Sequence, residues 1–187
     1  PIHAVELNQL EFSSNSKYKG SITPQKAKEL LRLTYEFIGN LNLEAIAVLV
    51  DNVCLRNQYA KPTNPYLLAY EIMIEKFQKI INERNDKDNT FGVVNISNAS
   101  TQLAMKLTKI HQDIMKIGTQ YVKFTTIFPK LNIQDTRESC FFELADLICY
   151  AYQRSYRNWI CQNMGKKTNE GENYLSYIEN LCKNIRI

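Results

Sequence analysis

Glu143 and Asp146 are the residues best placed to do chemistry in this sequence. They are three positions apart in DTRESCFFELADLICYAYQRSYRNW, a predicted helix from Asp135 to Trp159, and residues with this spacing are neighbours on a helix surface. Two carboxylates that converge in this way can bind one divalent cation through their oxygen atoms. The alternative is a solvated acidic patch held by local contacts on the same helix. The spacing alone leaves both interpretations open.

The same segment has the apolar period of a helix that packs against a core. At about 100° per residue, one side gathers seven residues: Phe141, Leu144, Ala145, Ile148, Tyr152, Ser155 and Trp159. Asp146 lies well off this side. A catalytic role requires that its side chain point into a pocket lined by a sheet rather than into bulk water. Cys140 and Cys149 flank the acidic pair and are predicted to be small buried hydrophobic residues, as cysteines on helices usually are. A catalytic thiol is disfavoured, because the sequence places no histidine to activate it.

Arginine and aromatic residues alternate in the second half of this predicted helix. Arg154 and Arg157 are interleaved with four aromatic residues: Tyr150, Tyr152, Tyr156 and Trp159. Guanidinium groups contact phosphates and aromatic rings stack on bases, so this composition suits nucleic acid. At helical spacing, however, Tyr152 and Trp159 also belong to the apolar side, so packing is the favoured interpretation and nucleic-acid binding the alternative.

Length and composition predict one globular domain over residues 1–187. Of the 187 residues, 44% are apolar and 22% are charged, which is typical of a folded domain. The net charge of +4 permits a partner that carries phosphate without demanding one. Five cysteines without a CxxC pair indicate free thiols and a cytoplasmic protein. No apolar run reaches the roughly 18 residues of a membrane helix, so no membrane partner is expected.

Helical and strand patterns alternate along the chain and predict an α/β fold. Phosphate-binding glycine motifs (GxGxxG and GxxxxGK) and the GxSxG motif of serine hydrolases are absent from the sequence, which excludes those classes of site. His111 is expected to be a surface or packed residue within a helix. Strands are predicted at 2–12, 45–51, 90–97 and 121–128, and helices at 24–39, 65–82, 98–118, 135–159 and 174–184.

The stretch DTRESCFFELAD resembles the C-terminal signature of a family catalogued as domain of unknown function 3800. The ELAD residues carry the specific part of the match, with Glu143 where glutamine is usual, and the opening IHAVEL places His3 in a similar segment. AIAVLVD and GVVNISN are similar to the two central strands of the family. The resemblance implies an RNase H-like mixed sheet flanked by helices. It also implies clustered aspartates that hold Mg²⁺ or Mn²⁺ for phosphodiester hydrolysis.

The sequence departs from the family pattern in two places. The first strand, with its Asp-Glu-Ser-Gly motif, has no counterpart, so we expect the first strand or strands to be missing from this chain. Asn95 stands where the family has an aspartate at the end of a strand, and an amide oxygen brings no charge to a metal. Asp146 is carried over from the family cluster, and Glu143 could replace a lost carboxylate. Asp51 and Asp135 are weaker candidates.

The resemblance therefore implies an RNase H-like domain related to metal-dependent nucleases, with weakened or lost activity. Its catalytic residues would be Asp146 and Glu143, its metal ligands these two with Asn95, and its contacts to RNA or DNA would come from Arg154 and Arg157. The alternative is a non-catalytic module of the same fold that binds nucleic acid or protein. A homo-oligomer is also left open, as is an unrelated α/β domain with a chance ELAD match.

Overall fold

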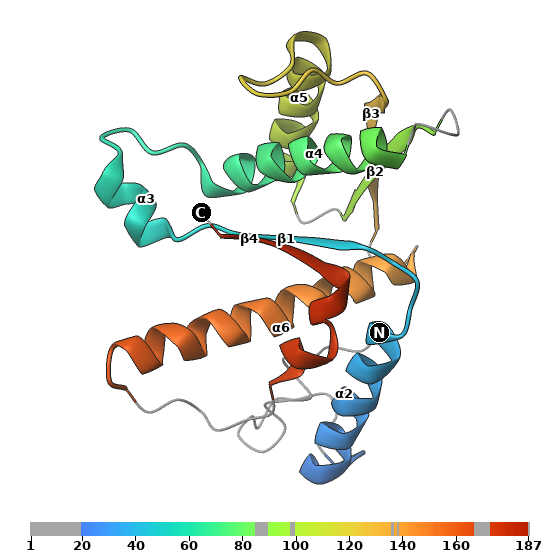
Figure 1. Cartoon of the computed structure of the whole chain (residues 1–187), viewed down its shortest axis with the longest axis vertical. Coiled ribbons are helices and arrows are strands. Elements are labelled where there is room, and N and C mark those ends of the chain that lie inside the picture. The colour runs from blue at the N-terminus through green and yellow to red at the C-terminus, as the bar shows by residue number, and fades with distance from the viewer. Residues whose placement is uncertain are drawn as a thin grey trace. The chain divides into compact units, whose positions relative to one another are not determined.

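The fold is mixed α/β with a small parallel sheet (Figure 1). The computed structural model describes residues 20–84, 90–97, 100–135, 137, 139–166 and 173–186, without the side chains of 182–186. The strand predicted at 2–12 lies outside these residues, and so does His3.

The chain divides into two compact units. Unit 1 consists of Pro1–Ala47 with Ser139–Lys183, and unit 2 of Val48–Glu138 with Asn184–Ile187. Strand β1 (Ala45–Leu49) pairs with strand β4 (Cys182–Arg186). All five residues of β1 are half-buried, whereas its apolar run predicted a strand buried on both faces.

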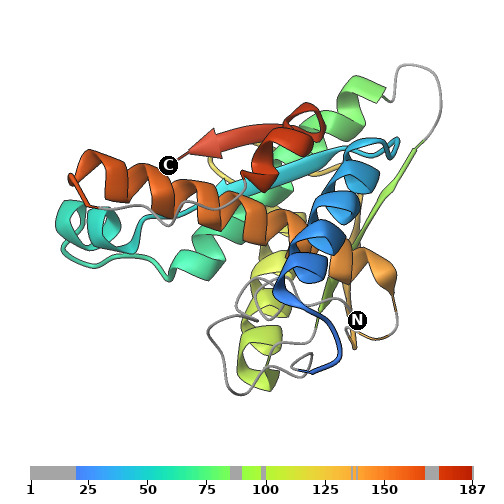
Figure 2. The ribbon, with the colours of Figure 1, turned by 90° about the horizontal axis from the view of Figure 1, so that it is seen from below.

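Unit 1 is built on two helices, α2 (Pro24–Gly39) and α6 (Cys140–Asn163), which cross as Figure 2 shows. Helix α2 begins as predicted, because the Thr23 side chain accepts a hydrogen bond from the Lys26 amide (3.3 Å) and proline follows it. Two 3-10 turns, η2 (Tyr174–Tyr177) and η3 (Glu179–Leu181), pack against α2. The helix predicted at 174–184 is therefore wrong: the segment forms these turns and then β4, because pairing with β1 overrides a weak local helical pattern.

The buried face of α6 differs from the predicted one. Four residues are buried: Leu147, Ile148, Ala151 and Tyr152. Phe141 and Trp159 are 71% and 49% exposed, so the buried face is rotated by roughly 40° from the predicted stripe at 100° per residue. The cause is the contact with α2, where the Tyr35 hydroxyl donates to the Leu147 carbonyl (2.8 Å).

Both cysteines that flank the acidic pair are exposed, which corrects the prediction of buried thiols. Cys140 is the first residue of α6, and Cys149 lies on the side of the helix away from its buried residues. A cysteine packs as a small hydrophobic residue only where another element covers it. The rotation of the buried face toward Leu147 and Ala151 leaves Cys149 on the exposed side.

Unit 2 contains the parallel pair β2 (Gly92–Ser97) and β3 (Ile127–Gln134). Its helices are α3 (Asn52–Gln58), α4 (Pro65–Arg84) and α5 (Thr101–Ile117). Helices α4 and α5 confirm the predicted helices that begin near 65 and 98. The core consists of side chains from α4, α5 and β3: Tyr70, Ile74, Ile81, Ile114, Ile127 and Leu131.

The third strand lies later in the sequence than predicted. The predicted strand at 121–128 is wrong, because β3 begins at Ile127 and continues through Pro129. Between Gly92 and Val94 of β2 the register shifts, so that these two residues pair with Ile127 and Leu131. A bulge of this kind accommodates proline, which has no N–H for the ladder. The β2 strand is not buried on both faces, since its burial alternates.

His111 is a packed residue of unit 2, as the sequence predicted. It is fully buried on α5, where its Nε2 lies 3.1 Å from the Phe128 carbonyl oxygen and its Nδ1 lies 2.8 Å from the Tyr70 hydroxyl. A carbonyl only accepts hydrogen bonds, so Nε2 carries the hydrogen and the Tyr70 hydroxyl donates to Nδ1. Burial lowers the pKa of His111, against the opposing effect of the Phe128 carbonyl.

Candidate functional site

Glu143 and Asp146 lie at the N-terminal end of α6, whose first turn is set by Ser139. The Ser139 side chain accepts a hydrogen bond from the Phe141 amide (3.3 Å) and caps the helix. Glu143 falls in the first turn, where the helix dipole favours a carboxylate. Glu143 is half-buried, whereas Asp146 is exposed, which contradicts the expectation that Asp146 is turned away from bulk water. Among the described residues, Asp146 has no hydrogen-bond or ion-pair partner.

Asp146 is an electrostatic neighbour of the buried Tyr35 hydroxyl. Burial raises the pKa of Tyr35 strongly, and the nearby Tyr150, Tyr174 and Asp146 raise it further, while Arg154 lowers it. Tyr35 therefore stays protonated and donates its hydrogen to α6. The exposed Asp146 carboxylate is thus close enough to the buried Tyr35 hydroxyl to raise its pKa.

The two arginines assigned to nucleic acid differ in their surroundings. The Arg154 Nη1 donates to the Tyr150 hydroxyl (3.3 Å), and the guanidinium lies 5.4 Å from the ring centroid of Tyr174. Arg154 is therefore held by the packing of unit 1 through a cation–π contact. Arg157 is exposed, and no described residue forms a hydrogen bond or ion pair with it.

Aromatic rings are paired near the C-terminal end of α6. The ring centroids of Tyr156 and Trp159 are 5.8 Å apart and the rings are inclined by 16°, which is a stacked arrangement. Tyr156 is half-buried and Trp159 is exposed. The favoured sequence interpretation, that Trp159 packs in the core, is wrong, because the buried face of α6 is centred on Leu147 and Ala151.

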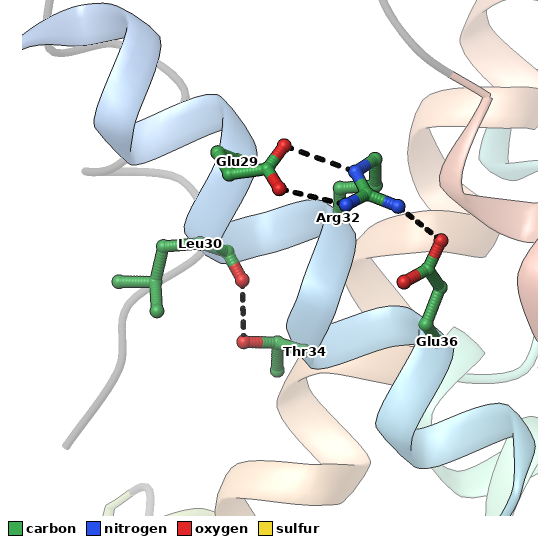
Figure 3. Close-up of polar contacts among 5 residues, drawn as sticks. All are labelled: Glu29, Leu30, Arg32, Thr34 and Glu36. Carbon is green, nitrogen blue, oxygen red and sulfur yellow. Dashed lines mark hydrogen bonds and ion pairs between the residues drawn. The ribbon is translucent and has the colours of Figure 1, made fainter.

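Several other carboxylates are occupied by basic side chains or helix amides. On α2, Glu29 and Glu36 lie on either side of Arg32 and both bind it (Figure 3). Arg32 lowers the pKa of Glu29 through its hydrogen bond. Asp135 binds Arg137 through both carboxylate oxygens (3.0 and 2.9 Å). These acids are neutralised locally and are poor candidates for metal ligands.

Asp51 caps helix α3, a short helix that the sequence patterns did not predict. Its Oδ1 accepts hydrogen bonds from the Val53 and Cys54 amides (2.8 and 3.0 Å). An aspartate in this position is a typical N-cap. These bonds make Asp51 a helix cap and so a poor candidate for a metal ligand.

Asn95 lies on β2 in unit 2, whereas Glu143 and Asp146 lie in unit 1. Its Oδ1 accepts a hydrogen bond from Nδ2 of Asn132 (3.1 Å), its register partner on β3. A carbonyl oxygen has a second lone pair, so this bond does not exclude coordination. Within the ranges that the structure describes, no three His, Cys, Asp or Glu side chains gather as a metal site.

A shallow groove in unit 2 was not predicted from the sequence. It has a volume of about 510 Å³ and is lined by one face of α5 and by β3: Thr101, Ala104, Met105, Thr108, Lys109, Gln112 and Ile133. The only sequence signal for it is the spacing of small residues on α5, which leaves room beside a helix.

No protein-family model, curated protein or solved structure matches the sequence. None of the helices in the described part of the chain is long and apolar enough to cross a membrane. Function is therefore inferred from the residues of α6 and their surroundings.

Proposed function

We propose that the protein is an RNase H-like domain related to metal-dependent nucleases, with weakened or lost phosphodiester hydrolysis. The observation that carries the proposal is that no described residue binds the Asp146 carboxylate within ELAD. The exposure of Asp146 does not meet the expectation that it faces a pocket, and it favours the form of the proposal in which activity is weakened or lost. The acids of α2 and Asp135 are bound by arginine. A carboxylate that no neighbour neutralises is available to a cation. The parallel β2–β3 pair agrees with the fold class.

The side chains present are of the chemical type that binds a hard cation, but they are few. Glu143 and Asp146 would hold Mg²⁺ or Mn²⁺ through oxygen atoms, which these ions prefer. Asn95 belongs to the other unit, so its part in the site stays a prediction from the sequence. The bound ion would stabilise the attacking and leaving oxygens of a phosphodiester. Only two carboxylates would bring charge to the ion, so we expect weak metal binding and slow hydrolysis.

The proposal is tested with the Asp146→Ala variant and a matched control, Asp113→Ala, which removes an exposed acid of α5. Manganese binding is measured by water-proton relaxation, and cleavage with labelled RNA and DNA. We expect wild type and Asp113→Ala to bind Mn²⁺ alike, and Asp146→Ala to bind it more weakly and to lose any cleavage. If neither quantity responds to Asp146→Ala, Asp146 is not a metal ligand and the proposal fails.

The second candidate is a non-catalytic module that binds nucleic acid or protein. Asn95 in place of an acid favours it, and so does the exposed Arg157 on α6. Phosphate contacts make nucleic-acid affinity fall steeply with salt, so a salt-independent affinity would direct attention to a protein partner. We also propose a cytoplasmic location, which suits the exposed thiols of Cys54, Cys140 and Cys149.

A further inference from the structure

We propose that an exposed apolar stripe of α2 binds the same stripe of a second copy of this chain, with the two helices antiparallel. The stripe consists of Leu30, Leu33 and Phe37, which are 40%, 49% and 63% exposed. Their spacing of three and four residues places them on one side of a helix. It is also the spacing of the positions at which paired helices contact each other. The stripe is separate from the metal site proposed on α6.

This stripe is a second apolar face of α2, distinct from the face that packs in unit 1. At 100° per residue, its centre lies roughly 130° around the helix from the centre of the core face. Figure 3 shows the Leu30 side chain pointing away from Arg32 and its ion pairs. A helix that covers one core needs one apolar face, so the stripe is available to another helix. The core face itself consists of four completely buried residues: Ala27, Leu31, Tyr35 and Ile38.

The charge beside the stripe favours an antiparallel pair. Lys26 lies on the same side of α2, about one turn before Leu30, and its side chain is exposed. No described residue forms a hydrogen bond or ion pair with its ammonium group. In a parallel pair the two Lys26 side chains would lie next to each other and repel. In an antiparallel pair they lie at opposite ends of the contact, about 16 Å apart along the axis at 1.5 Å per residue.

One antiparallel register gives every residue of the stripe a partner. Leu30 then lies opposite the partner's Leu33, and Lys26 lies opposite the partner's Phe37 and beside the partner's Glu36. The Lys26 ammonium group can contact both the aromatic ring and the carboxylate. Arg32 binds Glu36 through Oε1, so the other carboxylate oxygen remains able to accept. The two-fold symmetry of the pair repeats these contacts, so that each end of four central leucines is closed by complementary groups.

The contact is small, so we expect a transient dimer. Three partly exposed side chains from each copy bury less than the roughly 1,200 Å² of a standard stable interface. The side chains project from a helix that is already folded, which limits the entropy lost on binding. The fraction of dimer should therefore rise with protein concentration.

Sedimentation equilibrium of the full chain measures the dissociation constant, at concentrations up to about 1 mM. We expect monomer and dimer in equilibrium. Leu33→Glu should raise the dissociation constant by about 30-fold or more, the loss expected for a residue at the centre of an interface. Phe37→Ser should also raise it. Phe141→Ser is the matched control and should leave it unchanged, because Phe141 is an exposed phenylalanine of α6 in the same unit. Circular dichroism checks that each variant is folded.

Exchange of the charges tests the direction of the helices. Lys26→Glu and Glu36→Lys should each raise the dissociation constant about two- to fivefold, and the double variant should bring it back toward the wild-type value. Lys26 and Glu36 are about 15 Å apart along α2 at 1.5 Å per residue. They therefore cannot meet within one copy, and recovery in the double variant reports a contact between copies.

The inference is overturned if the chain is monomeric at every concentration, which would assign the stripe to another protein or to another part of the chain. It is also overturned if Leu33→Glu and Phe37→Ser associate as tightly as wild type, because the dimer would then use another surface. Failure of the double charge variant to recover affinity would overturn the antiparallel register.

Discussion

Replacing Gly39 by alanine tests how α2 is joined to the C-terminal turns of unit 1. Gly39 ends α2, and its carbonyl accepts a hydrogen bond from Nδ2 of Asn180 (3.2 Å). A Cβ atom at this position would lie closer than 3.0 Å to the Tyr177 carbonyl oxygen and 3.3 Å from its carbon. Those atoms belong to the backbone, so they cannot move aside by a change of rotamer.

The expected effect has the opposite sign to an ordinary glycine-to-alanine change in a helix. Alanine stabilises a helix interior by about 1 kcal/mol relative to glycine, whereas forcing atoms into a packed site costs about 1–3 kcal/mol. Loss of the Asn180 bond would add about 1 kcal/mol. We therefore expect Gly39→Ala to lower the free energy of unfolding of unit 1 by about 1–3 kcal/mol.

Urea unfolding followed by Trp159 fluorescence measures this change, because the residue is on α6 in unit 1. Asn40→Ala is the matched control: Asn40 is the next residue, is exposed, and loses only a hydrogen bond to the Glu36 carbonyl. Asn40→Ala should lower the free energy of unfolding by less than Gly39→Ala does. A Gly39→Ala protein that is as stable as wild type, or more stable, would refute the contact between α2 and the turn at Tyr177.

Two further predictions concern buried polar contacts. His111 has a lowered pKa in the folded state, so the unfolded chain takes up the proton first, and the free energy of unfolding should fall as the pH drops below about 6.5. In amide-exchange measurements on unit 2, His111→Gln should make the free energy of unfolding depend less steeply on pH in this range. An unchanged dependence would contradict the role given to His111. Tyr35→Phe removes the hydroxyl that donates to Leu147 and should cost about 1 kcal/mol in urea unfolding. No loss would show that this bond does not stabilise unit 1.

Local signals in the sequence were sufficient to predict α2, α4 and α5. Each begins at a polar cap whose side chain binds a nearby amide: Thr23, Asn64 and Ser100. Each also repeats apolar residues at helical spacing, and these interactions lie within a few residues of one another. The glycine at 118 ends α5 as predicted, with a φ of 86°.

The candidate site was predicted only in part, because its side chains depend on contacts between distant segments. The spacing of Glu143 and Asp146 on one helix follows from the sequence. The side of α6 that is buried does not, since Tyr35, 112 positions before Leu147, binds that residue's carbonyl. This contact rotates the buried face, leaves Trp159 exposed, and separates the packed Arg154 from the exposed Arg157.

Strand positions depended most on tertiary structure. The patterns at 121–128 and 174–184 were plausible locally, yet β3 begins at Ile127 and the chain end forms turns and β4. A strand is stabilised by its hydrogen-bonded neighbour, which is remote in sequence, so pairing decides where it starts and stops. Helix caps and helical periods depend on residues that are close together in the sequence. Strand register and the choice of which side of α6 is exposed depend on contacts that form only when the chain folds.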